Sequence, residues 1–154
     1  MPDAALADIT VLDLTHHIAG PYCTKLLATY GAEVIKVERP GRGDPARQVG
    51  PFPGDTPHPE KSGLFLHLNT NKQSITLNLQ HPRGQDLVRE LVKQIDVVVE
   101  NLSPRVLPSL RLSYAELAPL NARLVMTSIS NFGQTGPTAT GRRRIWSSMQ
   151  WAGR

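Results

Sequence analysis

The 154-residue chain has little cysteine, few aromatic residues and no long apolar run. Cys23 is its single cysteine, which excludes an internal disulfide and a cysteine-based zinc site and fits a reducing compartment. No stretch approaches the roughly 20 apolar residues that span a bilayer, and the amino-terminal segment lacks the basic and apolar regions of a signal peptide. We therefore expect a cytoplasmic protein with no membrane partner and no metal, and we interpret Cys23 as a small buried helix residue.

Acidic residues are missing from residues 138–154, which hold four of the 17 basic residues. The other 13 basic residues match the 13 acidic residues, so the net charge of +4 arises in this tail. Arg142–Arg144 and the two nearby tryptophans offer the phosphate contacts and stacking surfaces of a nucleic-acid-binding arm. So short a basic patch seldom binds specifically, and we expect no nucleic-acid partner.

Apolar runs alternate with helical patterns along residues 1–137. Strands are predicted for five short runs rich in β-branched and aliphatic residues: 9–15, 33–39, 74–79, 96–100 and 124–130. Helices are predicted from Pro21 to a cap at Gly31, over 82–95, and as short turns within 104–110 and 114–120. This alternation predicts one domain of the α/β class, with a Rossmann-like, mainly parallel sheet flanked by helices.

Residues 40–62 are rich in proline and glycine and are expected to form a long irregular loop. The triplet Arg42-Gly43-Asp44 within it looks like a cell-adhesion signal. Because no secretory sequence accompanies it, we interpret it as ordinary loop chemistry. After the first predicted strand, the segment His16–Pro21 lacks the G-x-G-x-x-G turn of a dinucleotide site, which disfavours a nicotinamide cofactor.

Four stretches, in this order, resemble the class III CoA-transferases, a family that includes formyl-CoA and carnitine CoA-transferases and related acyl-CoA racemases. They are VLDLTHHIAGPYCTKLLATYGAEVIKVERPGRGDPAR, LNTNKQSITLNL, DVVVENLSP and LVMTSISNFGQTGP. The resemblance implies a Rossmann-like fold and transfer of CoA between an acyl-CoA thioester and a carboxylic acid. These two molecules would be the substrates, and the reaction would need no prosthetic group.

Coenzyme A carries a pyrophosphate and a 3′-phosphate, so its pocket needs cations and backbone N–H donors at the carboxyl ends of parallel strands. The loop after the first strand leads into a helix and contains a glycine, which favours free N–H groups and close approach of a ligand. Without the resemblance, Arg39 reads as a solvated strand end and Asn101 as a turn residue. The resemblance implies that eight residues contact CoA: His16, His17, Ile18, Ala19, Arg39, Lys72, Asn101 and Leu102.

The resembling transferases use an aspartate nucleophile in a glycine-rich segment beyond the position of residues 124–130. No residue of this chain matches it, so we expect a fragment that is inactive alone. The alternatives are an acyl-CoA racemase or lyase of the same family, or a non-enzymatic CoA-binding remnant. Full-length relatives form interlocked homodimers. A fragment would be unable to do so, and we expect it to expose apolar surface and to aggregate.

The tail after Pro137 departs from the family pattern. Displacing the permissible codons of Arg144–Gly153 by two nucleotides can yield a segment that looks like the family's continuation. Because tryptophan and methionine each have one codon, this alternative is tightly constrained. We therefore expect residues 1–137 to form a truncated CoA-binding domain and residues 138–154 to be an aberrant basic tail, frameshifted or disordered, which sequencing of the gene would test.

Overall fold

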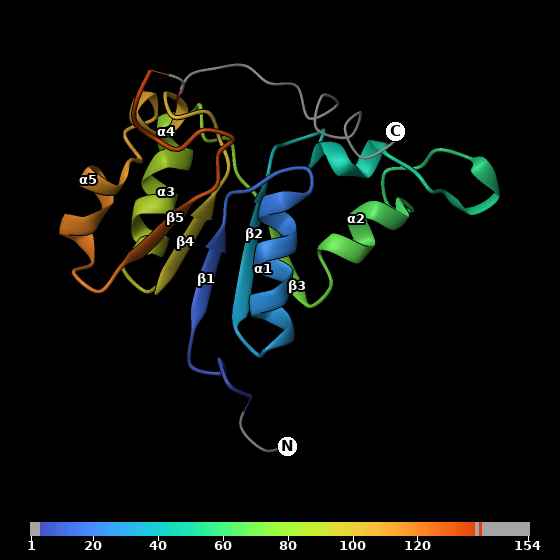
Figure 1. Cartoon of the computed structure of the whole chain (residues 1–154), viewed down its shortest axis with the longest axis horizontal. Helices are drawn as coiled ribbons and strands as arrows, with labels where there is room; N and C mark the ends of the chain where they lie inside the picture. Colours follow the sequence, from blue (N-terminus) through green and yellow to red (C-terminus); the bar gives the residue numbers. More distant parts are fainter. Residues whose placement is uncertain (1–3, 138, 140–154) are drawn as a thin grey trace.

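Five strands form one parallel sheet in the order β3-β2-β1-β4-β5 (Figure 1). The structure is a computed structural model that describes residues 4–137 and 139. Every neighbouring pair of strands runs parallel, which confirms the predicted α/β class. The strands are β1 (Thr10–Asp13), β2 (Glu33–Glu38), β3 (Lys72–Thr76), β4 (Val97–Glu100) and β5 (Val125–Ser128).

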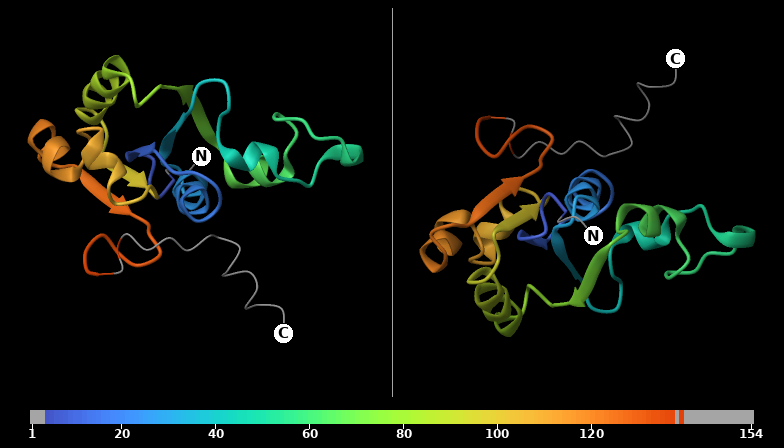
Figure 2. Two further views of the ribbon diagram at one scale, coloured as in Figure 1. Left: turned by 90° about the horizontal axis from the view of Figure 1, so that it is seen from above. Right: turned by 90° about the horizontal axis from the view of Figure 1, so that it is seen from below.

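Helices connect the strands and cover both faces of the sheet (Figure 2). The first βαβ unit agrees with its prediction, since Gly31 follows the first helix with a φ of 104°, a value that favours glycine. The helices are α1 (Ala19–Thr29), α2 (Gly63–Leu68), α3 (Pro82–Val92), α4 (Val106–Ser109) and α5 (Tyr114–Leu117), with 3-10 turns η1 (Pro45–Gln48), η2 (Pro53–Asp55) and η3 (Ala118–Leu120). Among residues 4–137 and 139, no helix has the length and apolar content that crossing a bilayer requires.

Two segments differ from their prediction. The third strand was expected at 74–79, but β3 begins at Lys72, because the ladder with β2 starts at the Val34 and Lys72 pair. Helix α2 was not predicted. Its amino end is fixed by the Ser62 hydroxyl, which accepts a hydrogen bond from the Phe65 N–H at 3.1 Å. Serine is among the preferred N-cap residues, so the sequence did contain a signal for the start of this helix.

The core lies on both faces of the sheet, and the two faces differ. On one face, Val88 and Val92 of α3 pack with Val98 of β4, and all three side chains are fully buried. On the other face, Val11 of β1 packs with Ala28 of α1. Small residues let α1 lie close to the sheet, and the space beneath it also holds charged side chains, which form the site described below.

The chain changes direction between β1 and β4. From β1 it moves outward to β2 and β3, and it then crosses back past β1 to β4 and β5. Open parallel sheets bind their ligands outside the carboxyl ends of the strands at such a switch point. The loops that flank it here are residues 14–18 after β1 and residues 101–105 after β4.

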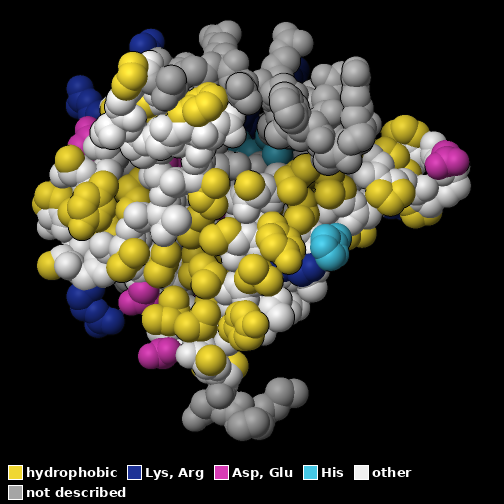
Figure 3. All heavy atoms as spheres, viewed as in Figure 1, with side chains coloured by type: hydrophobic (Ala, Val, Ile, Leu, Met, Phe, Trp, Pro, Cys, Tyr) yellow, Lys and Arg dark blue, Asp and Glu magenta, His cyan; other side chains and the backbone are white. Residues whose placement is uncertain are grey.

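One face of β4 and β5 has no helix over it among the described residues. Helix α1 lies in front of β1 and β2, whereas β4 and β5 are open on the same side (Figure 1). Val125 of β5 is 56% exposed there. Apolar side chains gather over this face and α1 (Figure 3). The prediction of exposed apolar surface is thus confirmed for the part of the chain that the structure describes. The predicted tail, apart from Ala139, lies outside that part.

Candidate functional site

The loop after β1 is held through its backbone by side chains from distant segments. The His16 N–H donates to Asn101 Oδ1 at 2.8 Å, and Asn101 Nδ2 donates to the His16 carbonyl at 2.8 Å. The His17 N–H donates to Asp44 Oδ1 at 3.1 Å. The expectation of free N–H groups is therefore wrong for His16 and His17, because folding supplies an amide and a carboxylate that accept from them.

A buried ion pair supports the same loop from the α1 side of the sheet. Lys36 Nζ lies 2.8 Å from Asp44 Oδ2, with side chains 1% and 0% exposed, and it donates to the Thr15 carbonyl at 2.9 Å. Asp44 also accepts from the Ala46 N–H at 2.8 Å and caps η1. Asp44 thus joins the proline- and glycine-rich loop to the β1–α1 loop.

The turn into α1 has an unusual backbone. His17 has a φ of 66°, in the left-handed region that side chains with a Cβ seldom occupy. Gly20 lies against Thr15, and a Cβ at this glycine would be 2.3 Å from the Thr15 Cβ. The glycine was expected to allow close approach of a ligand, but in the structure the Thr15 side chain occupies the space beside it.

The first turn of α1 carries no side-chain cap. Ile18 is the N-cap residue, and no side chain accepts a hydrogen bond there. Helix N-termini without a cap present N–H donors and a positive dipole end to anions. His17, Ile18 and Ala19 all have exposed side chains, so the helix end is accessible at the carboxyl edge of the sheet.

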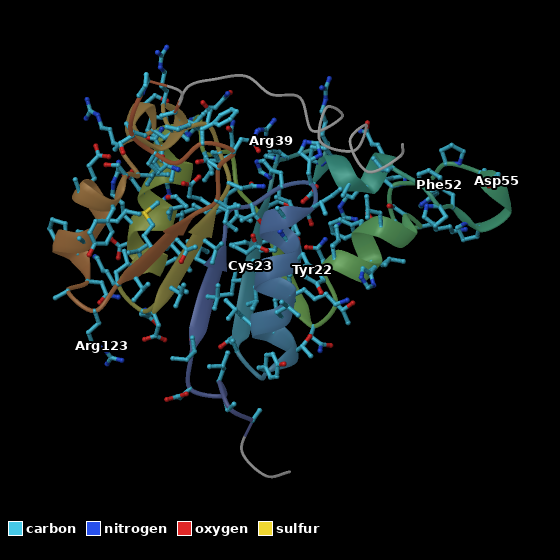
Figure 4. All side chains as sticks on the ribbon, viewed as in Figure 1. Tyr22, Cys23, Arg39, Phe52, Asp55 and Arg123 are labelled. Carbon is cyan, nitrogen blue, oxygen red and sulfur yellow. The ribbon has the colours of Figure 1, made fainter. Side chains whose placement is uncertain are left out.

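His16 and Arg39 lie near each other at the ends of β1 and β2. Burial lowers the pKa of His16 below its usual 6.5, and the Arg39 guanidinium lowers it further. The imidazole is therefore neutral at pH 7. Arg39 is exposed at the upper edge of the sheet (Figure 4), and no ion pair joins it to another described residue. The structure brings these two predicted residues together.

Lys72 lies elsewhere, beneath α1. Its ammonium is 3.0 Å from Asp13 Oδ2 and also lies 2.7 Å from the Thr24 hydroxyl and 2.9 Å from the Pro21 carbonyl. A further acceptor, Asn69 Oδ1, is 2.9 Å away. Since the Lys72 side chain is 1% exposed and an ammonium has only three donors, its hydrogen-bonding capacity is used inside the protein.

Burial lowers the pKa of Lys72 to about 8, although Asp13 opposes that shift. For Asp13 the balance is reversed. Burial alone would raise its pKa, but Lys36 and Lys72 hold it below the usual 3.8. Asp13 and Lys36 were missed as site residues. Their signal was a charged side chain inside an apolar strand run, which the fold can accept only if the charge is paired.

Leu102 follows Asn101 in the β4–α4 loop. Its N–H donates to Glu100 Oε2 at 2.7 Å, and its side chain packs against the core on the α3 side. The structure therefore brings Asn101 to the His16 backbone, whereas Leu102 is held mainly by its own strand end.

The proline- and glycine-rich loop is anchored by a second set of charges. Arg47 Nε lies 2.7 Å from Glu38 Oε2, and Ser74 donates to Glu38 Oε1 at 2.6 Å. Burial would raise the pKa of Glu38, but its hydrogen bonds to Arg47 and Ser74 and to the Asp44 N–H lower it to about 2. Arg47 also stacks 3.7 Å from the centre of the Phe65 ring. The loop thus has a defined conformation next to β2.

A pocket of about 550 Å³ lies at the β5 edge. Its lining includes Glu100, Leu107, Tyr114, Leu124, Met126 and Gln134, and none of the predicted CoA contacts. The pocket opens beside β5, whose outer side has no neighbouring strand among the described residues. A phosphate ligand would find no cationic side chain in its lining, so we place the candidate site at the switch point instead.

Comparison with known proteins shows which family the chain resembles. The chain is 46% identical to succinyl-CoA–D-citramalate CoA-transferase of Chloroflexus aurantiacus, covering 88% of this chain and 33% of that enzyme. It is 45% identical to formyl-CoA:oxalate CoA-transferase of Afipia carboxidovorans, covering 84% and 30%. The chain thus spans about a third of the length of the curated relatives it matches.

Solved structures also resemble this chain. A CAIB/BAIF family protein of Brucella suis matches with a TM-score of 0.85 and 34% identity, over 98% of this chain and 40% of that one. A Mycobacterium tuberculosis protein, Rv3272, matches with a TM-score of 0.86 and 32% identity, over 99% and 42%. The sequence model of CoA-transferase family III matches residues 6–142. Because this match covers most of the chain, the chain belongs to CoA-transferase family III.

Proposed function

We propose that this chain supplies the CoA-binding part of an enzyme that moves CoA between an acyl-CoA thioester and a carboxylic acid. The observation that carries the proposal is the arrangement at the switch point, where the uncapped first turn of α1 lies beside His16 and the exposed Arg39, which forms no ion pair within the described part of the chain. Helix N-termini and guanidinium groups are suited to phosphate. The names of the relatives point to the same substrate class.

The residues have distinct roles in this proposal. The α1 first turn and the exposed residues His17, Ile18 and Ala19 contact the ligand, and Arg39 binds a phosphate. Leu102 offers an apolar surface beside the second loop. Lys72 holds α1 against the sheet and acts as a positioning residue in place of the phosphate contact expected from the sequence, since its ammonium is bound by Asp13.

The transfer step needs a carboxylate nucleophile. Its oxygen attacks the thioester carbonyl, the C–S bond breaks and CoA leaves as the thiolate, so that a mixed anhydride remains. Four buried carboxylates lie at or near the switch point: Asp13, Glu38 and Asp44 are bound to Lys72, Arg47 and Lys36, and Glu100 accepts a hydrogen bond from the Leu102 N–H. We propose that the nucleophile belongs to a segment outside residues 1–137. In the same proposal, residues 1–137 form one CoA-binding domain, and the protein is cytoplasmic.

Two measurements on the 154-residue chain test the proposal. Isothermal titration calorimetry should detect heat with CoA and much less with pantetheine, which lacks the nucleotide phosphates. An exchange assay with labelled acetyl-CoA and a carboxylic acid should show no turnover. A folded sample that gives no heat with CoA would overturn the binding role, and measurable exchange would overturn the assignment of the nucleophile.

A further inference from the structure

Asn101 links the two loops that flank the switch point. The β1–β4 ladder runs as far as Asp13 and Val99, and the Leu14 N–H continues it by donating to the Val99 carbonyl at 2.9 Å. Beyond that point the connection passes from backbone to side chain. The Asn101 amide accepts from the His16 N–H and donates to the His16 carbonyl, both at 2.8 Å.

This pairing fixes how the side chain is oriented. The amide oxygen faces an N–H and the amide nitrogen faces a carbonyl, so the reversed orientation would place like dipoles together. A carboxylate in the same place could accept from the His16 N–H but would face the His16 carbonyl with a second oxygen. Asparagine therefore suits the contact in a way that aspartate does not.

The His16 backbone is also where the loop turns toward α1. His17, the next residue, has its φ of 66° and donates its N–H to Asp44. A strained conformation of this kind persists only when its surroundings determine it. Asn101 on one side and Asp44 on the other hold the two peptide groups that set the direction of the first turn of α1.

We propose that Asn101 is a positioning residue, which sets the spacing of the β1–α1 and β4–α4 loops and thereby the place of His16 and the α1 first turn. This inference rests on the proposed function, that is, on CoA binding at the switch point. Asn101 acts through the His16 peptide, which distinguishes its role from the direct CoA contact that the family resemblance implies.

A matched pair of variants of the 154-residue chain tests the proposal. Asn121 is also a partly buried asparagine that bridges backbone groups, because its Nδ2 donates to the Val92 and Ile95 carbonyls at 3.0 and 2.8 Å. Asn101→Ala should raise the Kd for CoA at least about tenfold, whereas Asn121→Ala should leave it within about twofold. Urea unfolding of both variants measures how far each loses stability.

A double-mutant cycle separates positioning from contact. If Asn101 acts through the His16 peptide, then His16→Ala should weaken CoA binding much less in the Asn101→Ala background than in the wild type. Hydrogen exchange of the His16 amide should also accelerate in Asn101→Ala, which removes its acceptor, but not in Asn121→Ala.

The outcomes distinguish the two proposals. The positioning role alone would be overturned if the wild type binds CoA and Asn101→Ala leaves its affinity unchanged. Additive effects of Asn101→Ala and His16→Ala on the affinity would also overturn it. Unaltered exchange of the His16 amide would do the same. A folded wild-type chain with no affinity for CoA would overturn the proposed function, and the positioning role would fall with it.

Discussion

The Lys72 ammonium lies 3.0 Å from the Asp13 carboxylate, and the two side chains are 1% and 0% exposed beneath α1. Removing one member of a buried ion pair leaves the other charge without compensation, which costs about 3–5 kcal/mol. We expect Lys72→Met to lower the free energy of unfolding by about this amount in urea titrations followed by circular dichroism. The control is Lys93→Met, at a half-exposed lysine paired with Glu90, which should change it by less than about 0.5 kcal/mol. Equal effects would show that the pair is not buried as described.

Acid should destabilise the protein through Glu38. Its pKa of about 2 in the folded state lies below the ordinary 4.5, so the unfolded chain binds more protons between these values. The stability that Glu38 contributes is present above pH 4.5 and is lost as the pH falls toward about 2. Glu38→Gln should flatten this part of the curve of unfolding free energy against pH. Glu90→Gln, at an exposed position, should not. An unchanged acid slope in Glu38→Gln would contradict the assignment.

Arg39 should contribute to CoA affinity through charge. A hydrogen bond to a charged group is worth about 1.5–3 kcal/mol, so Arg39→Ala should raise the Kd for CoA by about 10- to 100-fold. The control is Arg123→Ala. Arg123 is 87% exposed at the opposite end of the sheet (Figure 4). Calorimetry should find that Arg123→Ala binds CoA with unchanged affinity. Equal losses of affinity in both variants would mean that Arg39 acts only through the net charge.

The protonation of His16 should respond to Arg39. Because the guanidinium favours the neutral imidazole, Arg39→Ala should raise the pKa of His16 toward its usual 6.5, while burial continues to hold it below that value. The shift can be followed by NMR titration of the imidazole resonances. A His16 titration curve that does not move would show that the two groups are too distant to interact.

The exposed apolar side chains of α1 should limit solubility. Ile18, Tyr22, Leu26 and Tyr30 recur at every fourth position and are 37%, 48%, 40% and 60% exposed, so they form a stripe along one side of the helix. Parallel sheets normally have both faces covered, so apolar association through this stripe and β5 is expected. Leu26→Lys with Tyr30→Lys should reduce aggregation measured by light scattering.

The matched control for that substitution is Leu66→Lys on α2, where a single leucine is 56% exposed. It should leave aggregation nearly unchanged. A wild-type chain that unfolds sharply and reversibly as a monomer in calorimetry would contradict the role given to the α1 stripe.

The sequence alone determined the α/β class, because strand and helix periodicities depend on near neighbours in the chain. The strand predicted at 96–100, for example, corresponds to β4 and was predicted without tertiary information. The start of β3 was shifted by two residues, since its limit depends on the register with Val34. Likewise, α2 was missed because it is only six residues long and depends on the Ser62 cap and on burial of Phe65.

Only the tertiary structure decided what the polar residues do. Lys72 reaches Asp13 across 59 residues of sequence, and Asn101 reaches His16 across 85. Local patterns carry no information on such pairings, because they arise when the sheet places distant strand ends side by side. The sequence therefore predicted candidate residues for CoA binding, whereas folding decided that Lys72 and Asn101 bind other parts of the protein and that Arg39 forms no ion pair with another described residue.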